Sequence, residues 1–485
     1  MHIRRCILCL SMLLLMVCLP SAADDSILVR NCRPLLQHGM QPAQHRALRQ
    51  GGEVTNKMIG ERRQLVVLAS FSDQSFKDEE PVTLWNRIFN EQNFSEAPFV
   101  GSVHDYFYDQ SYGKFDLTFD VQLVELSESR VKYRSTSTDD ENSQYLVYDI
   151  VDELSTRELD WSLYDWDDDG YVDQLLIVYA GKGMNAGGDS NTIWPHQWWL
   201  SLHTDGHVCT VTSGEKDYTV DCYCCVQELY TNGNYGSFGT ICHEYSHCFG
   251  LPDFYNGSTS YLRSWDLMDY GNFNGGGFSP CSYSAHERML MGWLEPIELT
   301  EDIHVDGMPQ LAEQPVAYLI RNDGHADEYY VVENRQQTGW DQPLTGSGLV
   351  VFHVDYDKSI WTGVTEVPNS SKRKRYTIFP ANNKTSYRYA DGWPYPYLEN
   401  NLLTNDSQPA ATLNNTNTDG SKLMNKSLTE ISVTGGLASF NFSTTATGIE
   451  QHAVAGSEPT TLLYRIGSIH IVRNAQGKVL KVNRR

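Results

Sequence analysis

Basic residues are scarce in this chain of 485 residues. Lys and Arg together number 37 against 61 Asp and Glu, so the formal net charge at pH 7 is -24. An excess of negative charge repels phosphate backbones and anionic membrane surfaces. We therefore expect no nucleic-acid partner. The same carboxylates can supply cation sites, and calcium is the cation that we expect first.

Long apolar segments are also lacking. The run at residues 6–19 is too short to span a bilayer, and it lies between Arg4 and Arg5 on one side and the small residues 21–23 on the other. The order basic, apolar, small is typical of a secretory signal peptide, which we place at residues 1–23. No later run is long enough to anchor the chain. The mature protein is expected to be secreted, extracellular or at the cell surface, without a transmembrane segment.

Cysteine is sparse and unevenly placed. Three of the 11 cysteines lie in the predicted signal peptide, and the even number that remains favours disulfides in an exported protein, in a pairing that the sequence does not define. Of the cysteines outside the predicted signal peptide, all but Cys32 fall between residues 209 and 281. A structural zinc site there is disfavoured, because Cys222, Cys224 and Cys225 lack the paired C-x-x-C spacing.

The composition and the hydrophobic pattern of the chain change three times after the predicted signal peptide. Residues 24–60 are polar and without clear periodicity, as in a leader or pro-segment. Alternating β-prone runs and helical periods predict an α+β domain over residues 61–296. Short β-prone runs separated by Gly, Asn and Asp predict an all-β sandwich over residues 297–443. Residues 444–485 form a C-terminal tail that resembles a shortened sorting signal.

One short motif carries the chemistry. His243 and His247 lie four residues apart on a helix expected near residues 237–250, so both imidazoles leave the same face one turn apart. This HExxH arrangement suits two corners of a tetrahedral zinc site. Glu244 lies one position round the helix, where its carboxylate can reach water without binding the metal. The opposite face is apolar and is expected to be buried.

The motif extends beyond the helix. Gly250 supplies a turn residue, and Asp253 follows six positions after His247, so the returning chain can offer a third ligand. An HExxH pattern alone arises by chance in roughly a few per cent of chains of this length, whereas the longer string arises on the order of once in several thousand. The extended motif therefore outweighs an accidental match.

The residues HEYSHCFGLPDFY resemble the immune inhibitor A peptidases (the M6 family), in which Asp stands where astacins and matrix metalloproteases have a third His. Further segments resemble family landmarks in the family's order over roughly residues 61–355: GSVHDYFYDQSYGKFDL, DWDDDGYVDQLLIVYAGKG, TIWPHQW, SWDLMDYG, ERMLMGWLEP and YYVVENRQQTGWD. The resemblance implies a zinc metalloendopeptidase with an α+β, zincin-like (metzincin-like) catalytic domain at residues 61–296.

Two residues gain expected roles from this resemblance. Met268 resembles the Met-turn that lies beneath the zinc in metzincin-like enzymes, where it supports the site. Tyr270 stands where astacin-like and serralysin-like enzymes place a Tyr near the metal, and it could donate to the oxyanion. An ordinary half-buried Tyr is the alternative for Tyr270.

A second cation site is predicted upstream, where acidic residues alternate before Gly170: Asp165, Asp167, Asp169 and Asp173. A tight loop can point several such oxygens inward, as calcium requires. The loop is not a full EF-hand, because Leu176 stands where the last, bidentate Glu would be. Four carboxylates beside an apolar strand repel one another without a cation, which favours structural calcium over a solvated acidic turn.

The expected reaction is metal-assisted hydrolysis of peptide bonds in proteins or peptides. Zinc held by His243, His247 and Asp253 keeps one position open for water and lowers the pKa of that water. Glu244 takes the proton as general base and returns it to the leaving amine. Glu287, on a later segment, is the alternative third ligand.

Two other functions stay open. One is a calcium-stabilised secreted adhesin or binding module with a non-catalytic HExxH helix, against which the presence of Glu244 argues. The other is a zinc hydrolase that acts on something other than peptides. If the leader maintains latency, Cys32 could tether it through a disulfide or place a thiolate on the zinc.

Overall fold

The computed structural model describes residues 58–135, 142–186, 192–203, 206–230, 232–363 and 366–446. It also describes the backbone of three C-terminal strands, β17 (Thr460–Ile466), β18 (Ile469–Asn474) and β19 (Val479–Asn483). The predicted signal peptide, nearly all of the predicted leader, and Cys32 lie outside the described residues.

A five-stranded sheet organises the first half of the chain, in the order β2-β1-β4-β8-β5. The strands are β1 (Gly60–Ser70), β2 (Phe115–Glu125), β4 (Leu175–Lys182), β5 (His196–Trp199) and β8 (Cys222–Leu229). Neighbouring strands are parallel except at one edge, where β5 runs antiparallel to β8. Long buried runs such as that of β4 suit a mainly parallel sheet, whose two faces are both covered.

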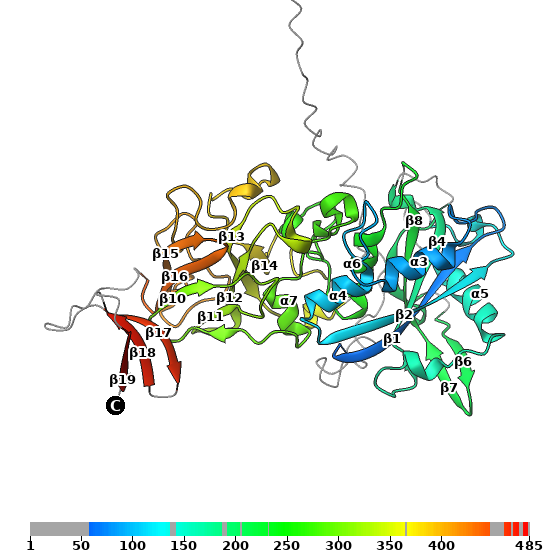
Figure 1. Cartoon of the computed structure of the whole chain (residues 1–485), viewed down its shortest axis with the longest axis horizontal. Helices are drawn as coiled ribbons and strands as arrows, with labels where there is room; N and C mark the ends of the chain where they lie inside the picture. Colours follow the sequence, from blue (N-terminus) through cyan, green and yellow to red (C-terminus); the bar gives the residue numbers. More distant parts are fainter. Residues whose placement is uncertain are drawn as a thin grey trace, which may run out of the picture.

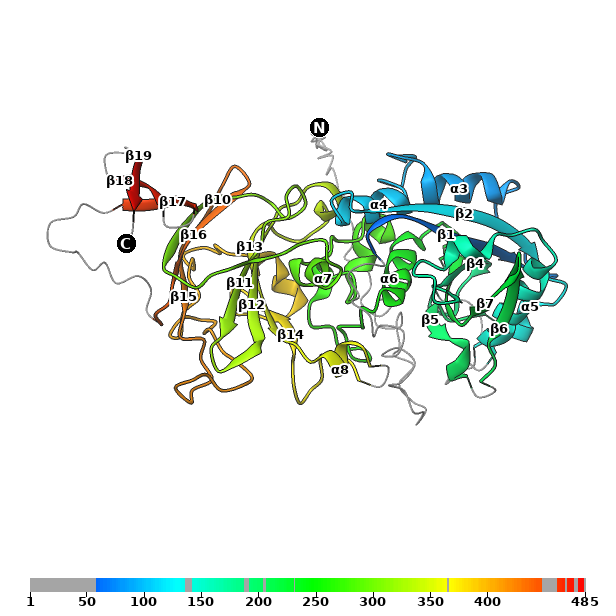
Figure 2. The ribbon, with the colours of Figure 1, turned by 90° about the horizontal axis from the view of Figure 1, so that it is seen from below.

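Helices and a small sheet cover the two faces (Figure 1, Figure 2). On one face lie α3 (Pro81–Asn90), α4 (Val103–Gln110) and α6 (Phe238–Cys248), which share a core with Val66 and Leu176. On the other lie α5 (Ser143–Ser155) and a sheet of order β3-β7-β6. Its strands are β3 (Tyr171–Val172), β6 (Cys209–Ser213) and β7 (Lys216–Val220). The helix α6 is thus fixed against the centre of the molecule.

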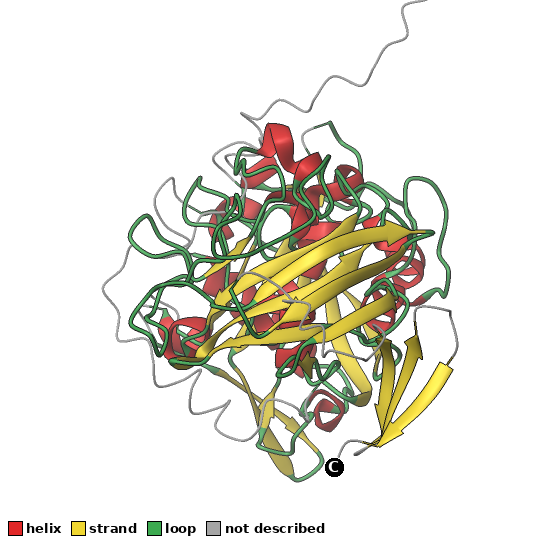
Figure 3. Ribbon diagram, turned by 90° about the vertical axis from the view of Figure 1, so that its left-hand side faces the viewer, coloured by secondary structure: helices red, strands yellow, loops and turns green. Residues whose placement is uncertain are grey.

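Two further sheets follow residue 296. The first has the order β14-β13-β12-β11-β9 and the second the order β10-β16-β15. The strands of the first are β9 (Ile297–Glu298), β11 (Tyr318–Asn322), β12 (His325–Arg335), β13 (Gly348–Asp355) and β14 (Tyr376–Ile378). Those of the second are β10 (Ile303–Met308), β15 (Ser427–Thr434) and β16 (Leu437–Ser443). Figure 3 views the molecule from the end where this half lies, and strands of this half cross the front of that view.

The two halves of the chain share a core. Val332 and Val351 face the second sheet, where they pack with Phe440. Val331 and Val350, their neighbours on the same strands, belong instead to the cluster that includes the residues of α6. Alternate residues of one strand point to opposite faces, so the first sheet is covered by the N-terminal half on one side. The structure is therefore a mixed α/β chain with several sheets, and the prediction of a separate all-β sandwich is met only in part.

The C-terminal tail contributes one more sheet. Its antiparallel strands follow the order β17-β18-β19 and lie at the end of the molecule away from α6 (Figure 1). Among the described residues, no helix has the length and apolar character needed to cross a membrane.

Candidate metal centre

The helix α6 runs from Phe238 to Cys248, within the range expected from the sequence. Gly250 ends it in a left-handed conformation, with φ of 96° and its N–H donating to the carbonyl of His247 at 2.9 Å. Glycine adopts this φ without the steric cost that a side chain would bring. The turn sends the chain back along the helix, so that Asp253 returns to the two histidines.

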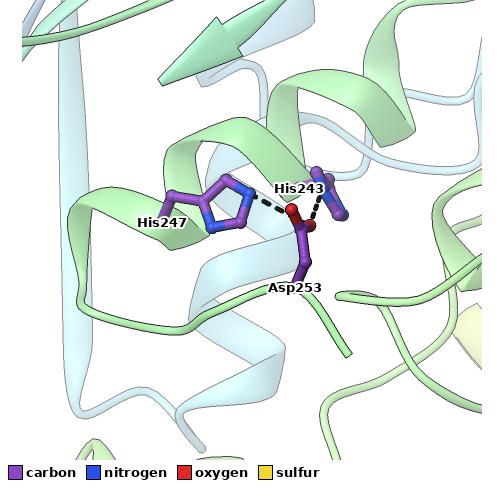
Figure 4. A group of neighbouring side chains, drawn as sticks. All are labelled: His243, His247 and Asp253. Carbon is purple, nitrogen blue, oxygen red and sulfur yellow. Dashed lines mark ion pairs between the residues drawn. The ribbon is translucent and has the colours of Figure 1, made fainter. Parts of the chain in front are cut away.

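Three side chains converge at this point (Figure 4). An oxygen of Asp253, Oδ1, lies 3.2 Å from Nε2 of His243 and 3.4 Å from Nε2 of His247. The three ligand atoms lie within 4.8 Å of one another. The side chain of His243 is 1% exposed, whereas those of Asp253 and His247 are 13% and 14% exposed, so the group is enclosed but still reached from one side.

Backbone carbonyls orient both imidazoles. Nδ1 of His243 lies 2.8 Å from the carbonyl of Leu267, and Nδ1 of His247 lies 2.7 Å from that of Leu251. A carbonyl only accepts, so each Nδ1 carries a proton, and each Nε2 is the ring nitrogen that faces Asp253. Outer partners of this kind hold metal-binding histidines in one tautomer and one orientation.

The donor atoms fit a zinc ion. Nε2 of His243 and Oδ1 of Asp253 are buried and have no hydrogen-bond partner, an arrangement that costs free energy unless something else satisfies them. Two imidazole nitrogens and a carboxylate oxygen are a donor set of catalytic zinc sites, which keep a fourth position open. His243, His247 and Asp253 could therefore hold the metal.

The charges of the group favour a cation as well. Burial by itself lowers the pKa of His243, but Asp253 and Glu244 outweigh it and raise that pKa to about 9. Burial opposes ionisation of Asp253, yet the two histidines hold its pKa below the ordinary value. Burial raises the pKa of Glu244, against the attraction of the same two rings. Glu244 is therefore electrostatically coupled to the group without being one of the three converging atoms.

The segment 265–270 supports the centre from below. Besides the carbonyl of Leu267, it provides the carbonyl of Met268, which accepts from the N–H of Phe254 at 2.9 Å. Met268 is fully buried, and Asp266 accepts from its N–H at 2.8 Å. The turn thus holds both His243 and the residue after Asp253.

Tyr270 lies beside this group rather than in it. Its hydroxyl is 3.5 Å from the carbonyl of Ser258, and its ring centroid is 5.9 Å from that of Tyr255. Tyr255 in turn stacks on His243 at 6.4 Å. Sequence reasoning missed Tyr255, although its position two residues after Asp253 on the returning segment could have indicated a contact with the centre.

Glu287 is not among the converging atoms. It lies in α7 (Ala285–Leu290), is fully buried, and its Oε2 accepts from the N–H and hydroxyl of Ser284 at 2.7 and 2.9 Å. These contacts form a capping box at the start of α7. Local helix capping accounts for the position of this carboxylate.

The acidic loop brings together only part of its predicted set. Ligand oxygens of Asp165, Asp167 and Asp173 lie within 4.8 Å of one another, whereas Asp169 accepts from the N–H of Tyr171 at 2.8 Å. Asp165 accepts from the N–H groups of Asp169 and Gly170 at 3.0 and 2.9 Å. Lys216 lies 3.2 Å from the same carboxylate.

The seven described cysteines are free thiols. Cys222 on β8 and Cys248 at the end of α6 come within 3.9 Å, sulfur to sulfur. Disulfide bonds are therefore absent from the described residues, in contrast to the expectation from the even number of cysteines.

Comparisons with known proteins agree with this geometry. Residues 63–292 match the family model described as immune inhibitor A peptidase M6, catalytic domain. The chain is 26% identical over 275 residues to Immune inhibitor A of Bacillus thuringiensis subsp. alesti, covering 46% of this chain and 38% of that protein. It is 24% identical over 310 residues to Pre-pro-metalloprotease PrtV of Vibrio cholerae serotype O1 (strain M66-2), covering 53% of this chain and 32% of that protein. The matches span about a third of the length of these curated relatives. The family match over residues 63–292 includes the segment with His243, Glu244, His247 and Asp253. The part of the chain that holds the metal centre is therefore similar to the catalytic domain of the immune inhibitor A (M6) peptidases.

Proposed function

We propose that this chain is a secreted zinc metalloendopeptidase that hydrolyses peptide bonds in proteins. One observation carries the proposal. Nε2 of His243, Nε2 of His247 and Oδ1 of Asp253 converge beside Glu244, while backbone carbonyls fix the other nitrogen of each ring. A site with buried donors, fixed tautomers and a neighbouring carboxylate has the parts that metal-assisted hydrolysis needs.

The residues divide the chemistry among them. Zinc, when bound, supplies a Lewis acid that polarises the scissile carbonyl and lowers the pKa of water. Glu244 accepts the proton of the attacking water and later passes it to the leaving amine. Its raised pKa suits this exchange, because a base whose pKa lies nearer the working pH transfers protons in both directions. Tyr270 is proposed to donate to the developing oxyanion.

The surrounding fold supports a zincin-like catalytic domain. The edge strand β5 is antiparallel to β8 and contacts α6, so an edge of the sheet lies beside the metal-binding helix. A calcium ion at Asp165, Asp167 and Asp173 is proposed to stabilise the loop before β4.

Secretion is proposed from the pattern of residues 1–23. Residues 24–60 are proposed to be a pro-segment, in line with the name Pre-pro-metalloprotease that the relative PrtV carries.

The test starts from the processed form recovered from culture medium, with its N-terminus determined by mass spectrometry. Casein hydrolysis should be lost on chelation and restored by zinc. Glu244→Gln should keep zinc and the melting temperature while turnover falls by about 10²–10⁴-fold, the usual contribution of general-base catalysis. Glu295→Gln, at an exposed position, is the matched control and should behave as wild type. Hydrolysis that survives chelation, or a fully active Glu244→Gln, contradicts the proposal.

A further inference from the structure

Basic residues are few in this chain, yet four of them gather with tyrosines at one place. Guanidinium carbons of Arg263 and Arg388 lie 5.8 and 6.0 Å from the ring centroid of Tyr387. The ammonium nitrogen of Lys374 lies 5.7 Å from the ring of Tyr261, and that of Lys384 lies 4.2 Å from the ring of Tyr389. These seven residues are called the basic–aromatic patch.

The patch is open to solvent. The residues Tyr387 and Tyr389 are 41% and 45% exposed, and Lys374, Lys384 and Arg388 are exposed as well. Contact with aromatic faces holds such cations in place without neutralising their charge. The patch therefore presents fixed positive charge on a chain whose net charge is -24.

Two arginines that flank Lys374 in the sequence differ from the patch cations because they form ion pairs with a buried carboxylate. Arg373 and Arg375 pair with Asp355 at 2.6 and 3.2 Å, and the carboxylate of Asp355 is only 1% exposed. In the described part of the chain, no carboxylate forms an ion pair with Arg263, Lys374 or Lys384. Arg263 also interacts electrostatically with the buried carboxylate of Asp269. The alternation separates Arg373 and Arg375, which pair with a buried carboxylate, from the exposed Lys374 between them.

One residue of the patch, Arg263, connects to the metal centre through a chain of contacts. The carbonyl of Arg263 accepts from the N–H of Tyr270 at 3.0 Å. Tyr270 packs on Tyr255, which stacks on His243. Arg263 also has a φ of 59°, a left-handed conformation that costs free energy for a residue with a side chain. Such strain tends to persist where function requires a particular side-chain position.

We propose that the basic–aromatic patch is a substrate subsite that binds acidic side chains of the cleaved protein, within a few residues of the scissile bond. This inference rests on the proposed peptidase function and adds a substrate class to it. An acidic segment is repelled by most of this surface, so a local positive cluster beside the centre selects and orients it. Guanidinium groups bind carboxylates through paired N–H donors, which gives direction as well as attraction. Since the charges come from two chain segments, several acidic residues should bind better than one.

The experiment uses three internally quenched peptides of equal length. One is neutral, one carries three Glu before the scissile bond in place of Gln, and one carries three Glu after it. Wild-type enzyme should cleave one of the acidic peptides with a kcat/KM about 10-fold above that of the neutral peptide, corresponding to about 1.4 kcal/mol. The preference should act mainly through KM and should shrink in high salt, because exposed charges are screened.

The double variant Lys374→Gln/Arg388→Gln should lose most of this preference and cleave the neutral peptide as wild type does. Both positions are exposed, so the melting temperature should not change. Arg263→Gln should act in the same direction. Lys132→Gln is the matched control, since that ammonium also lies over a tyrosine ring, at 5.4 Å, but outside the patch.

Equal cleavage of all three peptides by the wild type overturns the subsite, and so does an equal loss on all three in the double variant. Heparin binding that depends on the patch, with an acidic preference that does not, also overturns it and assigns the patch to sulfated polysaccharide. If wild type cleaves neither the peptides nor casein, the proposed function itself fails, and the subsite fails with it.

Discussion

The two candidate metal clusters differ in how many of their polar atoms already have hydrogen-bond partners within the protein. At the centre on α6, each imidazole has its outer nitrogen fixed by a backbone carbonyl, while Nε2 of His243 and Oδ1 of Asp253 are buried without partners. In the acidic loop, the oxygens of Asp165 already accept from two backbone N–H groups and face Lys216.

This difference has an energetic meaning. Buried donor atoms without partners carry a penalty that a metal ion removes, so binding and folding reinforce each other at the centre. The acidic loop satisfies much of its hydrogen bonding by itself, so a cation there should add stability without being essential. We therefore expect tight, function-determining binding at the first cluster and weaker, stabilising binding at the second.

The largest expected effect comes from Asp253→Asn. Replacing a charged ligand with a neutral one should weaken zinc binding by more than the roughly 10–100-fold typical of losing an outer partner. Zinc affinity measured by competition with a chromophoric chelator checks this. Glu287→Gln is the control and should keep zinc, because Glu287 caps its own helix. Zinc lost from Glu287→Gln but retained by Asp253→Asn would reverse the assignment of the third ligand.

A smaller effect is expected at the edge of the same centre. Tyr270→Phe should lower kcat by about 10²-fold with KM nearly unchanged, since loss of one oxyanion donor costs about 10²–10³. Tyr255→Phe, which keeps the ring that stacks on His243, should cost much less. If the two variants have the same kcat, Tyr270 has no chemical role beyond packing.

The acidic loop should respond through stability rather than turnover. Calcium at 100 times its dissociation constant should raise the free energy of unfolding by about 2.7 kcal/mol if it binds only the folded chain. Thermal unfolding with and without calcium measures this. Asp167→Ala should abolish the shift, whereas Asp169→Ala should keep most of it, since Asp169 lies outside the converging group. Equal losses in both variants would restore the four-carboxylate site expected from the sequence.

The smallest effect is expected from Lys216→Met. The ammonium lies 3.2 Å from Asp165 and competes with a cation, but its side chain is 47% exposed and the interaction is screened. Calcium affinity, measured by calorimetry, should therefore rise only about two- to fivefold, within the 0–1 kcal/mol typical of exposed pairs. Weaker calcium binding in this variant would indicate that Lys216 supports the loop instead of competing for it.

Sequence reasoning was most successful where the geometry is local. The range expected for α6, the turn at Gly250 and the proximity of Asp253 follow from helical periodicity and one left-handed residue. The family was also recognisable, since its landmarks lie in short contiguous segments, and the family match confirms it. The prediction of a separate β-sandwich is met only in part, because alternation along a strand does not reveal what covers each face.

The sequence by itself determined which residues can form a metal centre, because four-residue spacing on a helix places two imidazoles on one face whatever surrounds them. Only the tertiary structure decided how that centre is held. The carbonyl of Leu267 that fixes His243 comes from 24 residues away. Arg263 and Tyr387 likewise meet through segments that no local pattern connects. The same holds for Glu287 and Asp169, whose carboxylates are taken by nearby hydrogen bonds. Spacing identifies candidate ligands, but the competition among partners for each donor and acceptor is settled only when distant segments pack together.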